Sequence, residues 1–201
     1  KISSKYVTME RKQHTFPGEE LDERERVWRF ADYAAGACVS LLEGFMRHAQ
    51  ILNQLKPTYE EAAFALHYIL DNQQEEENVN LETCARVLFG LHHFAICLPF
   101  LNAEYIAVDD EDYAQTNLLI AKRILPVLKD FAAHTQCPPS YFNRIYTDIK
   151  DQCAHWDATL QEMIFAFEYL TEPAKYHNER DIKRMQTGLH LFAEYLQEMY
   201  N

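Results

Sequence analysis

Apolar residues recur every three to four positions through most of this 201-residue chain. That spacing is typical of amphipathic α-helices, whereas a half-buried strand would alternate apolar and polar residues. The pattern therefore predicts an all-α protein, a compact bundle of about six helices. We expect these helices at about residues 19–55, 58–72, 81–98, 109–134, 138–170 and 178–199.

Capping and breaking residues indicate where the helices end. Lys56-Pro57 is expected to stop the first helix, and Thr58 with Glu61 three residues later is a capping-box pattern for the second. Asn80 is the expected cap of the third helix. The carboxylates of Asp109–Asp112 would complement the dipole at the start of the fourth.

Two segments of the sequence echo each other. Residues 86–95 (RVLFGLHHFA) parallel residues 184–193 (RMQTGLHLFA), and residues 64–71 (FALHYILD) parallel residues 165–172 (FAFEYLTE). A weaker echo pairs Asp32-Tyr33-Ala34 with Asp112-Tyr113-Ala114. We interpret these matches as two three-helix units, about 19–102 and 109–200, related by duplication. The alternative is a helical protein that reuses Phe, Ala, Leu and His.

Composition places the chain among ordinary globular proteins, with 48% hydrophobic and 25% charged residues. Residues 15–201 are expected to form a single helical domain after a basic N-terminal arm, residues 1–14. The net charge is −12; the arm carries +3, which leaves −15 on the rest. Such a balance disfavours binding to nucleic acid or to an anionic membrane. The chain contains no run of 18 apolar residues, so we expect no insertion into a membrane.

Five cysteines occur, an odd number with no C-x-x-C pair. Most lie within apolar helical patterns, where a free thiol behaves as a small hydrophobic group. A disulfide framework is not expected, and we predict a cytoplasmic location.

Motifs for metal, cofactor or nucleophilic chemistry are not evident. The sequence has no Glu-x-x-His pair of the di-iron type, and adjacent His92 and His93 point about 100° apart on a helix. Cys153 with His155 is a candidate thiol–imidazole pair, although helical cysteines in apolar stripes are usually inert. We therefore expect no metal and no cofactor.

Arg86 and His92 form an Arg-x5-His motif, and Arg184 and His190 repeat it. Such a motif on a helix of an all-α domain resembles the HEPN ribonucleases, in which two copies face each other to cleave RNA. The resemblance implies that His92 and His190 act on the 2′-hydroxyl while the two arginines hold the phosphate. A spacing of six residues, however, separates Arg and His by about 120° around the helix. The alternative is a packing motif around Gly90 and Gly188.

A third functional class is a bundle that binds haem or another hydrophobic ligand between its halves. His48, His92 and His134 are the candidate axial ligands for that class. The alternative is that each is an ordinary histidine of the core or surface.

A binding surface is the function that the sequence favours, because aromatic and acidic residues are abundant while catalytic motifs are not evident. The chain has 12 Tyr and 12 Phe. We expect a non-enzymatic interaction module, such as an adaptor, chaperone or immunity-type inhibitor, that holds a basic or helical segment of a partner protein in a groove between helices. The candidate binding residues are Glu75, Glu76, Glu77, Tyr105, Asp109, Asp110, Glu111 and Asp112.

Overall fold

The computed structural model describes residues 18–71, 80–135, 138–140 and 142–200. Extended pairing among them is limited to one isolated bridge, between Ala49 and Val108, so the all-α prediction is confirmed. The α-helices are α1 (Glu23–Trp28), α2 (Phe30–His48), α3 (Lys56–Asp71), α4 (Leu81–Cys97), α5 (Thr116–His134), α6 (Phe142–Ile145), α7 (Ile149–Thr171) and α8 (Glu179–Tyr195). Short 3-10 turns are η2 (Leu98–Phe100), η3 (Glu111–Tyr113), η4 (Pro173–Lys175) and η5 (Leu196–Glu198).

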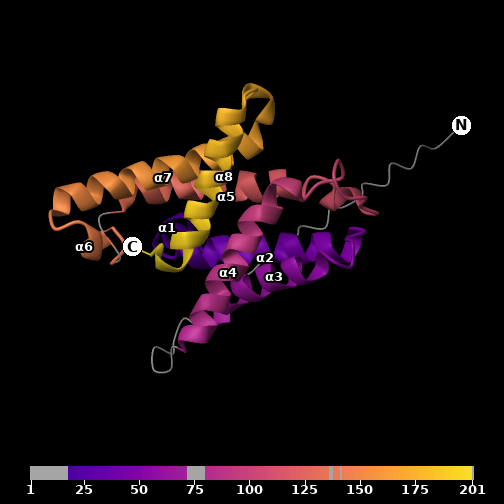
Figure 1. The fold of residues 1–201 in the computed structure, drawn as a ribbon, viewed down its shortest axis with the longest axis horizontal. Helices are drawn as coiled ribbons and strands as arrows, with labels where there is room; N and C mark the ends of the chain where they lie inside the picture. Colours follow the sequence, from indigo (N-terminus) through magenta and orange to yellow (C-terminus); the bar gives the residue numbers. More distant parts are fainter. Residues whose placement is uncertain (1–17, 72–79, 136–137, 141, 201) are drawn as a thin grey trace, which may run out of the picture.

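The long helices form two layers. Helices α3, α2, α5 and α7 pack side by side in that order. Helices α4 and α8 pack against each other and cross this layer, α4 over α3 and α8 over α7 (Figure 1). The two hairpins α3–α4 and α7–α8 therefore meet along the contact between α4 and α8.

The core between the layers is built from phenylalanines. The ring of Phe30 lies 5.4 Å from that of Phe131 and 6.3 Å from that of Phe192, which in turn meets Phe167 edge-on at 5.0 Å. All four side chains are almost fully buried. Each fully buried ring contributes about 1.5–3 kcal/mol through removal of apolar surface from water. These contacts join α2, α5, α7 and α8 into one core.

The single helix predicted over residues 19–55 is wrong. Asp22 caps α1 in a capping box with Glu25, and the chain leaves helical geometry at Arg29 before α2 starts. Helix α2 then ends at His48. Lys56-Pro57 opens α3 rather than stopping a helix, because proline is well tolerated in a first helical turn. Thr58 consequently lies inside α3, and its predicted capping role is wrong as well.

Two other predicted boundaries are corrected. Asp109–Asp112 do not open a long helix: Asp110 caps the short η3, and α5 begins only at Thr116. The helix predicted over 138–170 is split, with Asp148 capping α7 after the short α6. The predicted cap at Asn80 is confirmed, since its side chain accepts the backbone N–H of Glu82 at 2.9 Å. Local capping by Asp decides these starts more strongly than hydrophobic spacing does.

The two hairpins make the same close backbone contact. A Cβ on Gly90 would lie 2.4 Å from the carbonyl oxygen of Glu61, and a Cβ on Gly188 would lie 2.2 Å from that of Glu162. Only glycine allows α4 to approach α3, and α8 to approach α7, this closely. Alanine faces each glycine from the partner helix, Ala65 and Ala166 respectively.

Each hairpin is also closed by an arginine one turn before its glycine. Arg86 bonds Glu61 at 2.9 Å and lies over the ring of Phe64, 3.7 Å from its centre. Arg184 bonds Glu162 at 2.8 Å and lies 3.8 Å from the centre of the Phe165 ring. The stronger sequence echoes thus mark equivalent contacts.

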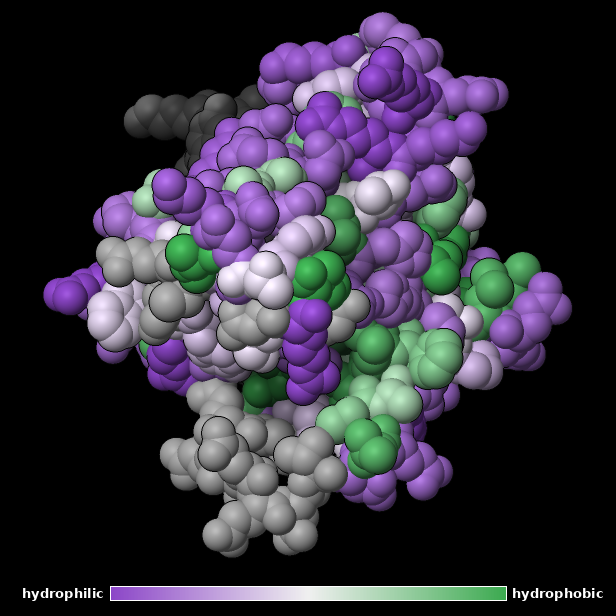
Figure 2. Space-filling model, turned by 60° about the vertical axis from the view of Figure 1, so that its left-hand side comes forward, coloured by the Kyte–Doolittle hydropathy of each residue, from purple (hydrophilic) through white to green (hydrophobic). Residues whose placement is uncertain are grey.

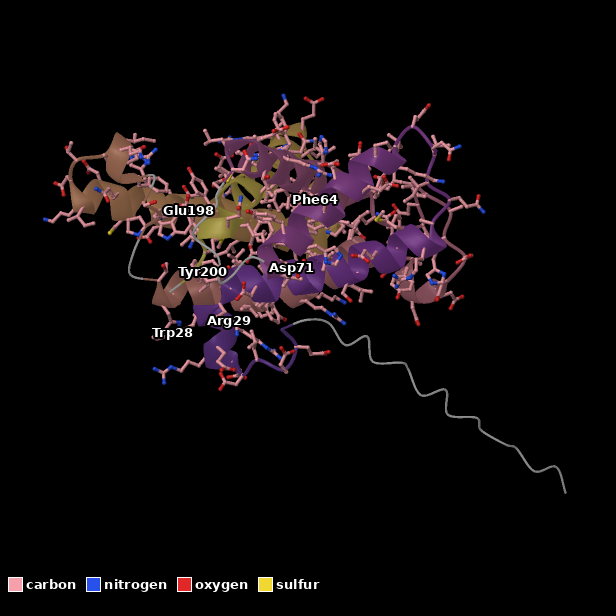
Figure 3. The ribbon with its side chains drawn as sticks, turned by 90° about the horizontal axis from the view of Figure 1, so that it is seen from below. Trp28, Arg29, Phe64, Asp71, Glu198 and Tyr200 are labelled. Carbon is pink, nitrogen blue, oxygen red and sulfur yellow. The ribbon has the colours of Figure 1, made fainter. Side chains whose placement is uncertain are left out.

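The weaker echo does not share this equivalence. Asp32 lies within α2, whereas Asp112 lies in η3. Asp32 is buried and accepts hydrogen bonds from Arg29 Nε and from the hydroxyl of Tyr200, both at 2.9 Å. Arg29 and Tyr200 accordingly lie near each other (Figure 3). This contact joins the C-terminal end of the described chain to the start of α2.

Substitution of either hairpin glycine by alanine tests the close approach. Gly90→Ala and Gly188→Ala are each expected to lower the free energy of unfolding by about 1–3 kcal/mol, because the added Cβ pushes against a backbone carbonyl. Urea denaturation measures the change. The matched control is Thr187→Ala, at an exposed neighbouring position of α8, which should stay within about 0.5 kcal/mol of the wild type. An unchanged urea midpoint in both glycine variants would contradict the close packing.

Candidate functional site

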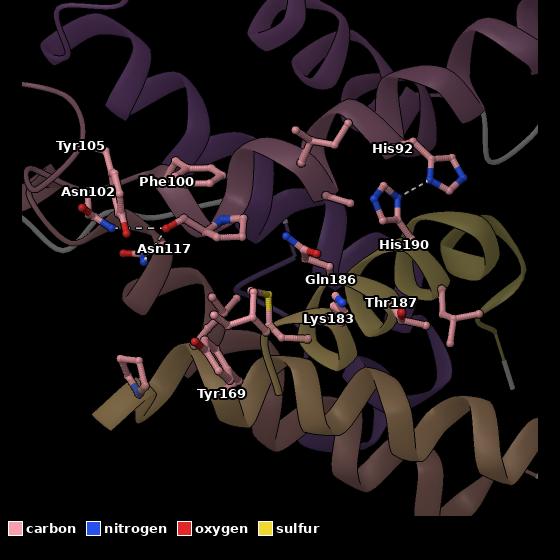
Figure 4. Close-up of a pocket in the computed structure, with 18 of the residues that line it drawn as sticks. His92, Phe100, Asn102, Tyr105, Asn117, Tyr169, Lys183, Gln186, Thr187 and His190 are labelled. Carbon is pink, nitrogen blue, oxygen red and sulfur yellow. Dashed lines mark hydrogen bonds between the residues drawn. The ribbon is translucent and has the colours of Figure 1, made fainter. Parts of the chain in front are cut away.

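A groove of about 1170 Å³ runs between α4 and α8 and ends against the segment that follows η2. His92 and His190 lie at one end, and Phe100, Asn102, Tyr105 and Asn117 lie at the other (Figure 4). Glu194 also lines the groove and contacts His92. Tyr169 of α7 and Lys183, Gln186 and Thr187 of α8 line the part between them. We call this the α4–α8 groove.

The structure brings two of the predicted site residues together. His92 Nδ1 lies 2.8 Å from His190 Nδ1, and the rings stack with centres 5.1 Å apart. His92 Nε2 lies 2.9 Å from a carboxylate oxygen of Glu194. A hydrogen-bonded chain therefore runs from Glu194 through His92 to His190.

The two arginines of the Arg-x5-His motifs do not join this chain. Arg86 reaches Glu61 on α3, and Arg184 reaches Glu162 on α7. Each arginine thus lies on the side of its helix that faces its own hairpin partner, as expected for a six-residue spacing. The end of the groove holds both histidines without either arginine.

Burial and charge act together on His190. Burial of its ring lowers the pKa of His190 below its ordinary value, and the neighbouring His92 lowers that pKa further. Both effects disfavour the charged imidazolium. The neutral form of His190 is therefore favoured.

The predicted acidic binding residues are not part of the groove lining. Asp109 bonds His48 Nδ1 at 2.8 Å, and Asp110 lies 3.8 Å from His48 Nε2. Glu111 and Asp112 lie in η3 next to them. Glu75, Glu76 and Glu77 fall outside the described residues.

Tyr105 is the predicted binding residue that does line the groove. It is exposed and meets the ring of Phe100 edge-on, with centres 5.0 Å apart. The predicted aromatic residue therefore lies in the groove, whereas the predicted acidic residues Asp109 and Asp110 lie against His48 at the end of α2.

The candidate haem ligands lie apart and have other partners. His48 stacks on Tyr113 with ring centres 5.0 Å apart, and His134 Nδ1 bonds the carbonyl oxygen of Asp130 at 2.7 Å. Of these three histidines, His92 is the one that lines the α4–α8 groove. Within the described part of the chain, no group of three or more His, Cys, Asp or Glu side chains is arranged to hold a metal ion.

The described cysteines are free thiols. Burial raises the pKa of Cys97 to about 12 and raises the pKa of Cys38 as well. The candidate pair Cys153–His155 is not supported. Instead of contacting Cys153, the His155 ring stacks on Tyr146 with ring centres 4.1 Å apart. Buried, protonated thiols are poor nucleophiles.

Sequence reasoning missed an apolar stripe beside the groove. Phe89 is 67% exposed, Ile96 52% and Phe100 45%. Figure 2 shows one face on which hydrophobic side chains gather in patches among hydrophilic ones. A spacing of seven and then four residues places all three on one side of the helix, so the signal was present. The sequence alone does not say which apolar side of a helix faces the core.

Residues Leu81–Phe100, which include this stripe, are long and apolar enough to cross a membrane by length and composition alone. An 18-residue window of this segment has a mean hydropathy of 1.3, and 39% of that window is buried inside the protein.

Comparison with known proteins identified no relative of this chain. No protein-family model matches the chain, and no curated protein and no solved structure matches it significantly.

The pKa of His190 predicts a pH-dependent stability. The unfolded chain binds a proton near pH 6.5, whereas the folded chain resists it, so this stabilisation is present above about pH 6.5 and is lost as the pH falls. The melting temperature of the wild type should therefore fall more between pH 7.5 and 5.5 than that of His190→Gln. His134→Gln, at an exposed histidine, should keep the wild-type slope. Identical slopes for all three proteins would show that His190 is not linked to folding.

Proposed function

We propose that this chain is a non-enzymatic protein-interaction module that binds an amphipathic, basic helix of a partner protein in the α4–α8 groove. We place it in a reducing compartment, the cytoplasm, because its described cysteines are free. An adaptor, a chaperone and an immunity-type inhibitor all share this mode of binding.

The observation that carries this proposal is a difference between the matched helices α4 and α8. Phe89, Ile96 and Phe100 are exposed apolar residues beside or within the groove. The positions 98 residues later are Thr187, Glu194 and Glu198, all exposed and polar. Since both helices have the same contacts to their hairpin partners, solvent exposure alone does not explain apolar residues on α4. An exposed apolar patch with a polar border is typical of an interaction surface.

The spacing and charge of the surface define its occupant. Apolar residues seven and four positions apart match the repeat of a packed helix, which presents its own apolar residues every three to four positions. Glu104 and Glu194 lie at opposite ends of the groove, and the chain beyond the N-terminal arm carries −15. Opposite charge steers and orients a partner, so the helix should carry lysine or arginine beside its apolar side.

We also infer that the two hairpins arose by duplication. The matched glycine contacts and the matched arginine–glutamate–phenylalanine clusters support this inference. The apolar side of α4 would then be a later specialisation of one copy.

A library of displayed 16-residue helical peptides with randomised surface positions tests the binding proposal. We expect the selected peptides to be amphipathic and net positive, because they must cover the stripe and balance Glu104 and Glu194. Fluorescence anisotropy with a selected peptide should show at least about tenfold weaker binding to Ile96→Glu, which places a charge in the apolar contact.

The matched control for this experiment is Leu52→Glu. It introduces the same charge at an exposed apolar residue outside the groove and should bind the peptide as the wild type does. Selection of neutral or acidic peptides, or equal loss in both variants, would overturn the proposal.

A ribonuclease is the second candidate, carried by the contact between His92 and His190. It predicts cleavage of single-stranded RNA that is lost in His92→Ala and in His190→Ala. The binding proposal predicts no such cleavage by the wild type. An assay of all three proteins on one labelled RNA distinguishes the two functions.

A further inference from the structure

The chain Glu194–His92–His190 has only one arrangement of protons when both histidines are neutral. A carboxylate accepts hydrogen bonds, so the proton of His92 lies on Nε2, 2.9 Å from Glu194. His92 Nδ1 therefore accepts, and the proton of His190 lies on the facing Nδ1, 2.8 Å away. His190 Nε2 is left with a lone pair.

This lone pair belongs to a residue of the groove wall. His190 lines the α4–α8 groove, and its ring points toward His92 across the gap between the two helices (Figure 4). Among the described residues, no hydrogen bond or ion pair engages His190 Nε2. The hydrogen-bonded chain thus fixes an acceptor atom at the same end of the groove as the carboxylate of Glu194.

The geometry points to a cation subsite in which His190 Nε2 accepts a hydrogen bond from a primary ammonium or guanidinium group while Glu194 balances its charge. This inference rests on the proposed function, because the cation is a lysine or arginine of the bound helix. The subsite specifies where on that helix the charge must lie: beside the histidines, at the end of the groove away from Tyr105.

The surrounding groups favour a cation here only while His190 is neutral. Lys183 is the cation that lines the groove, whereas Arg86 and Arg184 are bound by glutamates of their own hairpins. Protonation of His190 replaces the acceptor with a donor and adds a positive charge. Binding of a cation is therefore expected to weaken as the pH falls. The other titratable groups around this end are His92 of α4, Glu194 of α8 and Glu198 of η5. Tyr169 of α7 lines the middle of the groove, and Glu104 after η2 lies at its other end.

The first test determines the tautomers in the protein alone. Long-range ¹H–¹⁵N correlation spectra at pH 7.5 should show His190 protonated on Nδ1 and His92 protonated on Nε2. In Glu194→Ala, which removes an exposed acceptor, His92 should lose this preference. Protonation of His190 on Nε2 in the wild type would overturn the inference.

The second test uses hexylammonium as the probe and hexanol as its neutral counterpart. Titration with hexylammonium at pH 7.5 should give a saturable shift of the His190 Nε2 resonance, and hexanol should not. The affinity should fall by about tenfold in Glu194→Gln, as expected for loss of a charge-assisted contact. It should fall similarly when the wild type is titrated at pH 5.

Glu179→Gln is the matched control for charge, because it removes one exposed carboxylate at the far end of α8. It should bind hexylammonium as the wild type does. Equal shifts with hexylammonium and hexanol, or equal losses in Glu194→Gln and Glu179→Gln, would overturn the subsite. Since neither test uses a peptide, failure of the peptide selection with success here would overturn the helix-binding proposal alone.

Discussion

The architecture depends on a close backbone approach that occurs once in each hairpin. Gly90 and Gly188 let a helix lie directly against a carbonyl of its neighbour, and the arginine one turn earlier closes the same contact with a glutamate and a phenylalanine ring. The hairpins then meet through α4 and α8, so the position of each histidine is set by its own hairpin. The contact between His92 and His190 is thus a consequence of two separately fixed helices.

Helices α4 and α8 carry matching residues at their hairpin contacts but different residues on their outer sides. At the hairpin contact both helices carry a glycine and an arginine, which make the same close contacts in each hairpin. On the outer side, where packing requires nothing, α4 carries Phe89 and Ile96 while α8 carries Thr187 and Glu194. Glu194 therefore has two roles. It is the polar counterpart of Ile96, and it orders the protons of the histidine pair.

The sequence predicted what depends on local spacing and missed what depends on contacts between distant segments. The all-α class, the cap at Asn80 and the repeated Arg-x5-His segments were evident from the residues themselves. The break at Arg29 was not, because apolar spacing continues across it and the capping box at Asp22 precedes it by only one short helix. The histidine pair was named for catalysis with two arginines. In the structure the two histidines contact each other, whereas each arginine binds a glutamate within its own hairpin. Residue spacing shows that α4 has apolar sides but not which of them faces solvent, because that depends on how the two layers cross.

The buried cysteines can report on opening of the core. Of the four described cysteines, Cys38 in α2 and Cys97 at the end of α4 are buried, while Cys84 and Cys153 are partly accessible. A disulfide-exchange reagent at neutral pH should modify the accessible pair at once and wait for unfolding to reach the buried pair. Because the slow phase requires separation of the two layers, its rate measures how often the core opens under native conditions, without any label or denaturant. A ligand that holds α4 and α8 together should lengthen that phase, which turns thiol kinetics into a binding assay.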